Sequence, residues 1–274
     1  MDELPIAPPE TVSVEFSLGV AEGVITATAI VPAGHTTLTQ ILPVLQALDD
    51  SIIHSVAAAN EEAGHPVSCK AGCGACCRQL VPISIFEAEA LADWIHSQPE
   101  TAQQQLANRF HQTLLALSAS GILDRLVNMG QEDWRNDTEV NQQMCIDYLY
   151  QRIPCPFLVD ESCSIHPIRP LICREYLVTS PAANCSDPGV LKISPVRLPV
   201  KLFPALNQIG AELEHDVRGW IPLVFLFAWM KANAHPGNRV SGPGPSVLYE
   251  VVRRIAQPQS ESQSPEQPPS TTVL

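Results

Sequence analysis

Residues 69–77 read CKAGCGACC, and this stretch governs the interpretation of the whole chain. Four cysteines in nine positions have no packing explanation, because a protein core accepts isolated cysteines as small apolar side chains. Gly72 and Gly74 allow the backbone to bend tightly enough to direct several thiolates inward. The pattern therefore predicts a metal-binding knuckle, in which a tight turn presents the ligands.

A second group of cysteines follows in the segment CPFLVDESCSIHPIRPLICREY (residues 155–176) and ends with Cys185. Four prolines in or beside this segment stiffen its backbone. Its cysteine spacings match neither a zinc finger nor a ferredoxin. The second group therefore indicates a metal site only in combination with the first group. Closing the long loop between the two groups costs only a few kcal/mol by the logarithmic law, roughly what metal–thiolate bonds offset. We expect one spatial unit formed across a helical insert.

The candidate metal ligands are eight cysteines: Cys69, Cys73, Cys76, Cys77, Cys155, Cys163, Cys173 and Cys185. They exceed the four thiolates that one tetrahedral zinc or one cubane cluster takes. Either two sites exist, or some thiols support the ligands or act as redox partners. The neighbours Cys76 and Cys77 point in different directions and need not bind the same ion. Cys145 lies in a helical stretch and is expected to be a core cysteine.

Three further side chains in the second segment are candidates for supporting the ligands. His166 is expected to donate a hydrogen bond to a cysteine sulfur, because sulfur ligands are already in excess. Metal ligation and a plain turn position before Pro167 are the alternatives. Arg169 and Arg174 either offset the negative charge of the thiolates or lie as surface charges on a helix, and the sequence leaves both readings open.

Composition limits the functions that the chain can have. It has 274 residues, 45% of them apolar, enough to fill a core. Sixteen basic residues against 29 acidic ones give a net charge of −13, which disfavours nucleic acid and anionic membrane surfaces as partners. The start, MDELPIAPPE, lacks the apolar run of an export signal, so we expect a cytoplasmic location. In that reducing compartment, clustered thiols hold metal or do redox work.

The spacing of apolar residues predicts a mainly α-helical fold with a small N-terminal β-hairpin, organised around the cysteine-rich metal site. Residues 12–31 alternate between apolar and polar, as a hairpin does. Ser84 and Glu87 form a capping-box pattern at the start of a helix. Helical spacing is found over residues 41–63, 84–95, 100–126, 139–150, 198–214, 220–234 and 246–256. The stretch from Trp220 to Met230 is too short to span a membrane.

We divide the chain into an N-terminal hairpin and helix (1–66), a cysteine-cluster metal-binding domain (67–187), C-terminal helices (188–257) and a tail (258–274). The tail has no apolar period and is expected to be disordered. Removing it should leave stability and metal content unchanged.

Taken together, the two cysteine groups resemble the YkgJ-like cysteine-cluster family, marked by C-x3-C-x2-C-C and by a distal CPFL...CSIHPxRPxxCR segment. The resemblance covers about residues 67–187 and includes His166, Arg169, Pro170, Arg174 and Tyr176. It implies a domain that chelates zinc or iron, the latter as an iron–sulfur cluster. The family is similar to flagellin lysine N-methylases, so the resemblance also admits an iron–sulfur enzyme.

Three classes of function remain open: a metal-binding module that supports an unidentified protein partner, an iron–sulfur enzyme, and a redox or metal-sensing switch. The spacing C-x3-C-x2-C also occurs in enzymes that bind a cubane with S-adenosylmethionine. Against an enzyme of that type, Ala75 stands where an aromatic residue is usual, and no alternating strands and helices follow. No glycine-rich nucleotide loop is present either. The sequence thus leaves open whether the protein is an enzyme.

Overall fold

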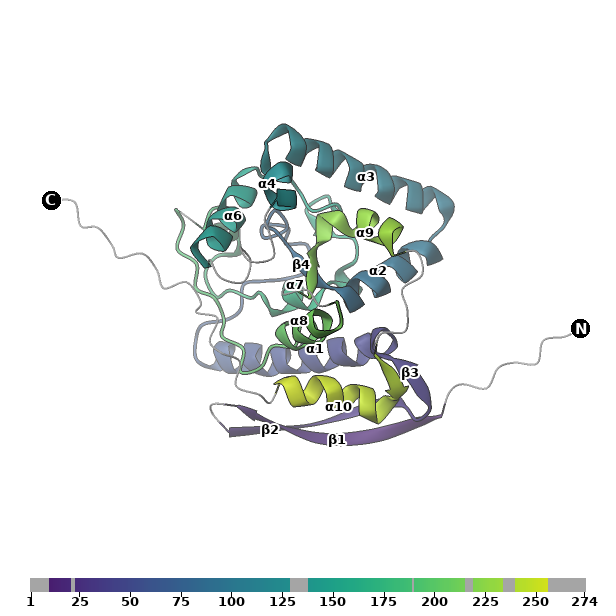
Figure 1. Cartoon of the computed structure of the whole chain (residues 1–274). Coiled ribbons are helices and arrows are strands. Elements are labelled where there is room, and N and C mark those ends of the chain that lie inside the picture. The colour runs from purple at the N-terminus through teal and green to yellow at the C-terminus, as the bar shows by residue number, and fades with distance from the viewer. Residues whose placement is uncertain are drawn as a thin grey trace, which may run out of the picture.

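The computed structural model describes residues 10–20, 23–128, 138–188, 190–214, 219–233 and 240–255. Helices dominate it, and the N-terminal hairpin is present, so the predicted fold class is confirmed (Figure 1). The proposed disordered tail lies outside the described residues. The helices are α1 (Leu38–Glu62), α2 (Ile85–Ser97), α3 (Glu100–Ala119), α4 (Ile122–Asn128), α6 (Thr138–Tyr150), α7 (Leu171–Glu175), α8 (Phe203–Glu214), α9 (Leu226–Ala232) and α10 (Gly244–Ile255).

The strands form separate antiparallel pairs. In the hairpin, β1 (Thr11–Val20) pairs along its whole length with β2 (Gly23–Pro32). Its alternation places Val12, Val14 and Phe16 toward the body of the protein, whereas the other face carries serine, threonine and glutamate. The remaining pairs are β3 (His35–Thr37) with β8 (Ser241–Pro243), β4 (Pro82–Ser84) with β7 (Trp220–Pro222), and β5 (Leu158–Val159) with β6 (Ser162–Cys163).

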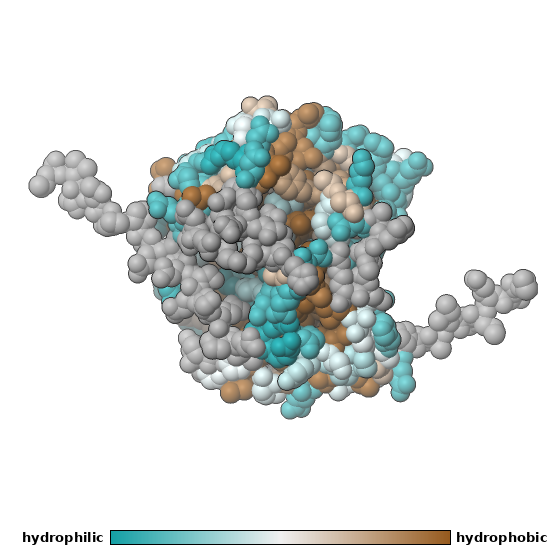
Figure 2. Space-filling model, in the orientation of Figure 1, coloured by the Kyte–Doolittle hydropathy of each residue, from teal (hydrophilic) through white to brown (hydrophobic). Residues whose placement is uncertain are grey.

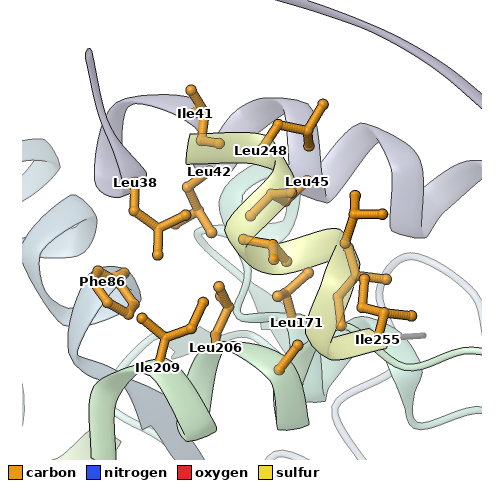
Figure 3. Packing of buried hydrophobic residues seen from close by; sticks show 14 of the residues in the cluster. Leu38, Ile41, Leu42, Leu45, Phe86, Leu171, Leu206, Ile209, Leu248 and Ile255 are labelled. Carbon is orange, nitrogen blue, oxygen red and sulfur yellow. The ribbon is translucent and has the colours of Figure 1, made fainter. Parts of the chain in front are cut away.

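The largest core cluster lies between the hairpin, α1, α8 and α10. Thr37 and Gln40 form a capping box that starts α1, and every third or fourth residue of its first four turns is buried. These side chains meet the apolar faces of α8 and α10 (Figure 3). Leu171 of α7 and Phe86 of α2 belong to the same cluster. The helix that carries Cys173 is therefore anchored to the N-terminal and C-terminal parts of the chain.

A second core cluster joins α2, α3 and α9 to the cysteine-rich segment. The predicted capping box is present, since Ser84 Oγ accepts from Glu87 N and Glu87 Oε2 accepts from Ser84 N. Phe157, two residues after Cys155, packs edge-on against Phe110 of α3 at a centroid distance of 5.4 Å. In Figure 2, hydrophobic residues are visible in the upper part of the molecule and again near the centre of the face.

The helical prediction for residues 220–234 is wrong at its start. Trp220–Pro222 form the strand β7, which pairs with β4, and α9 begins only at Leu226 after a short 3-10 turn. Pro222 has no N–H to continue a helix, and Leu223 N instead donates to Val81 O. A partner far away in the sequence decides the local structure here.

Within the described part of the chain, α1 is the helix that is long and apolar enough to cross a membrane by length and hydropathy. One side of α1 is buried in the largest core cluster, and the buried residues of α1 include the acidic residue Asp49. A core helix passes the same test.

Candidate metal centre

The first cysteine group folds as a chain of tight turns. Cys73 N donates to Lys70 O at 3.1 Å, and Cys77 N donates to Gly74 O at 3.0 Å. Gly72 has a φ of 84°, a left-handed conformation that costs glycine little and other residues more. These successive turns form the knuckle, residues 69–77, and confirm the tight backbone that the sequence predicts there.

The second group is docked directly on this knuckle. Cys155 N donates to Cys77 O at 2.7 Å. A Cβ atom added at Gly74 would lie 2.8 Å from Leu158 Cδ1, so the β5–β6 hairpin sits where only glycine leaves room. Arg78 forms an ion pair with Glu161 at 2.5 Å across the same contact. The structure thus brings the two groups together, as the sequence led us to expect.

The end of the second group is fastened to the start of the first. Ser68, one residue before Cys69, donates its backbone N–H to Val178 O and its hydroxyl to Ser180 O. The hydroxyl of Tyr176 donates to the sulfur of Cys185, which lowers the pKa of that thiol, although burial raises it to about 11 overall. These contacts hold the segment that carries Cys185 beside the start of the first cysteine group.

Cys76 is the electrostatic centre of the group. A hydrogen bond with Cys77 lowers the pKa of Cys76 and raises that of Cys77, so Cys76 carries the charge of the pair. Burial is the main cause of raised pKa values at five further thiols, and the charge of the Cys76 thiolate raises each of these pKa values further. These thiols are Cys69, Cys155, Cys163, Cys173 and Cys185. Cys73 belongs to the same group, since its charge raises the pKa of Cys69 and Cys185.

The donor chemistry fits zinc or iron, both of which bind thiolates. Buried thiols that repel one another once ionised need a cation to stabilise their thiolate forms. The side chains are gathered without being in coordination geometry: among the described residues, no three His, Cys, Asp or Glu side chains converge tightly enough to hold an ion.

The three supporting candidates differ in their surroundings. His166 lies with its ring nitrogens 2.8 and 3.1 Å from Arg169 Nη1, so its nearest side-chain partner is the arginine. Arg169 is half-buried, and its charge lowers the pKa of Cys69, Cys76 and Cys163. It therefore lies within electrostatic reach of the thiols.

Arg174 is almost fully buried and has a different set of partners. It forms an ion pair with Asp50 of α1 at 2.7 Å and donates to the carbonyl oxygens of Arg169 and Pro167. These bonds fasten the turn before α7 to α1. A surface helix charge, one of the two readings of the sequence, does not describe this residue.

Buried carboxyl groups that the sequence analysis did not single out hold α7 at both ends. Glu87 Oε1 accepts from Leu171 N at 2.7 Å, at the first residue of α7. Glu175 Oε1 accepts from Leu202 N and Phe203 N, at the start of α8. Each carboxyl group satisfies backbone donors at a helix start. The capping-box pattern at Glu87 shows one of these roles in the sequence, but the second partner is 84 positions away.

Cys145 is exposed on α6, so the expectation that it is a core cysteine is wrong. The buried residues near it on α6 are Met144, Tyr148 and Leu149, so Cys145 is exposed although Leu149, one turn later, is buried. The weak amphipathic pattern of this stretch did not fix which side faces inward.

Comparison with known families bears on the same part of the chain. Residues 68–189 match the family model named CxxCxxCC, described as "Putative zinc- or iron-chelating domain". The match agrees with the cysteine-cluster family that this segment of the sequence resembles. The CxxCxxCC match encloses both cysteine groups and leaves out the hairpin, α1 and the helices after α7. No curated protein and no solved structure matches the chain.

Proposed function

We propose that the protein is a metal-chelating cysteine-cluster protein whose centre has a structural role. One observation carries this proposal: the thiols gather where the chain has little regular structure. Among the described residues between Gln151 and Val200, the regular elements are the two-residue strands β5 and β6, two 3-10 turns and the five-residue α7. Because such a segment has few of the backbone hydrogen bonds of sheets and helices, these bonds stabilise it only weakly. Metal–thiolate bonds can supply the missing stabilisation.

The eight cysteines of the two groups are the proposed ligands, with Cys76 at their centre. Bound zinc or an iron–sulfur cluster supplies positive charge that stabilises buried thiolates. Arg169 adds charge compensation from the protein, and Arg174 positions α7 through Asp50. Residues 67–187 are the proposed metal-binding unit, and a reducing compartment such as the cytoplasm suits its free thiols.

Anaerobic purification with elemental analysis and an absorption spectrum tests the proposal. A brown chromophore with iron and sulfide identifies a cluster, and a colourless protein with stoichiometric zinc identifies a zinc centre. Chelation of either metal should lower the melting temperature, because the role is structural. A folded, metal-free protein in which all nine thiols titrate would overturn the proposal.

The absorption spectrum of the same preparation distinguishes a redox role of the metal centre from a structural one. If the metal is redox-active, mild oxidants change the spectrum reversibly, whereas a purely structural zinc centre shows no such change.

An iron–sulfur enzyme related to protein lysine N-methylases is the alternative. The strand pairs in the described residues are all antiparallel, so the knuckle does not follow a strand of a parallel βα barrel there.

A further inference from the structure

The outer edge of β2 is unprotected in the described part of the chain. β2 pairs with β1 on one side, and the two strands make a two-stranded sheet. Proteins commonly guard such an edge with lysine, an inward-pointing charge or a proline within the strand. β2 reads GVITATAIVP, which has no charged residue and places its proline at the very end. The edge is thus open to pairing with another strand.

An apolar groove runs along β2, between the strand and α1. It has a volume of about 710 Å³, and its walls include Ile25 and Ala27 of β2 and Val44, Leu48 and Val56 of α1. α1 packs along β2, whereas α10 covers the inner face of both strands. An open strand edge beside an apolar groove is a place where a partner strand can dock.

The sequence of β2 is self-complementary in one antiparallel register. When Ala27 faces Ala27 of a second copy, Val24 faces Ile30 in both directions, and the threonines at 26 and 28 face each other. Val24 and Ile30 are 69% and 65% exposed, the two most exposed large apolar side chains in the hairpin. In this register, the side chains on the inner face of β2 in one copy lie on the same side of the joined sheet as those on the inner face of β2 in the other copy. The same holds for the outer faces, as the pleat of the strands requires. It also pairs every residue from Gly23 to Val31 and leaves out Pro32, which has no N–H to donate.

We propose that a second copy of this chain occupies the groove, joining the two hairpins through β2 into a continuous four-stranded sheet. Two chains of net charge −13 repel each other, and this repulsion is smallest where neither surface carries charge, as along β2. A nine-residue strand edge about 30 Å long and about 10 Å deep supplies about 300 Å² per copy. A standard interface buries about 800 Å² per copy, and the α1 side chains that line the groove, including Val44, Leu48 and Val56, add to the contact.

Sedimentation equilibrium over a range of concentrations, with charge substitutions at the paired positions, tests both the dimer and its register. The wild type should have twice the 29.8 kDa mass of the chain. Val24→Lys combined with Ile30→Lys places lysine opposite lysine and should weaken association at least tenfold. Val24→Lys combined with Ile30→Glu places opposite charges across the two-fold axis and should restore it. Thr11→Lys, on the exposed outer face of β1, is the control and should leave the dimer intact.

The outcomes separate cleanly, and none of them depends on the metal centre. All four proteins should keep the same circular dichroism and metal content, since both substituted positions are exposed. A monomeric wild type at every concentration overturns the proposal. A dimer that is equally stable in the Lys–Lys and Lys–Glu variants overturns this register. A monomer that sediments with vesicles of anionic and zwitterionic lipid would also overturn it, since the groove would then face a membrane.

Discussion

The backbone N–H of Cys155 donates a 2.7 Å hydrogen bond to the carbonyl oxygen of Cys77. This bond joins the two cysteine groups at the last residue of one and the first of the other. Ion pairing of Arg78 with Glu161 and the close approach of Leu158 to Gly74 reinforce the same junction. Ligands from both groups are therefore expected to depend on one another.

Loss of a ligand from either group should release metal from the whole centre. We expect Cys73→Ser and Cys163→Ser to lower the metal content to a similar extent and to speed hydrogen exchange in α7, because one centre holds both segments. Cys145→Ser, at an exposed thiol of α6, is the matched control and should change neither. Full metal retention in Cys163→Ser alone would show that the two groups are independent, and metal loss in Cys145→Ser would make Cys145 a ligand.

A methyl group at Gly74 should separate the knuckle from the β5–β6 hairpin. In Gly74→Ala the new Cβ would meet Leu158 Cδ1 at 2.8 Å and the backbone oxygen of Glu161 at 2.9 Å. We expect a loss of about 1–3 kcal/mol in the free energy of unfolding, as for other overpacked sites, together with weaker metal binding. Chemical denaturation and metal titration measure the two effects. Gly34→Ala is the control, since no atom lies within 4 Å of its added Cβ; equal stability of both variants would contradict the prediction.

Removal of the Glu87 carboxylate should loosen α7. This group accepts hydrogen bonds from Ser84 N, Ser84 Oγ and Leu171 N at 2.7–2.8 Å in a fully buried position. Because Glu87→Ala leaves those donors unsatisfied, we expect a loss of about 3 kcal/mol in stability and faster hydrogen exchange at Leu171 and its neighbours. Glu100→Ala, at the exposed start of α3, provides the comparison. Unchanged exchange in α7 would mean that other contacts hold this helix.

Asp49 should make the protein less stable as the pH rises toward neutrality. It is fully buried on α1, neither of its oxygens has a hydrogen-bond partner, and burial raises its pKa to about 7. The unfolded chain releases this proton near pH 4, whereas the folded protein holds it until about pH 7, so stability falls over that interval and is constant above it. The shift corresponds to about 4 kcal/mol as an upper figure.

Asp49→Asn tests this directly, because the amide has the same shape and does not ionise. The stability of the variant relative to the wild type should rise between about pH 4 and pH 7 and stay constant above, measured by urea denaturation at several pH values. Glu15→Gln, on the exposed face of β1, should show no such trend. A difference between Asp49→Asn and the wild type that does not change with pH would rule out titration of Asp49 in the folded protein.

The sequence by itself determined the features that depend on neighbours along the chain. The tight turns of residues 69–77, the alternation of the hairpin and the Ser84–Glu87 capping box all arise from residues within a few positions of one another. The same local patterns were enough to predict a mainly helical fold and a cysteine-rich centre.

Only the tertiary structure decided the features whose partners lie far apart. Trp220–Pro222 form a strand because β4 offers an edge, and Cys145 is exposed although Leu149, one turn later on α6, is buried. Glu87 holds α7, and Asp50 pairs with Arg174, through contacts that span 84 and 124 positions. Local periodicity carries no information about such partners, since the free energy of these contacts is gained only after distant segments pack together.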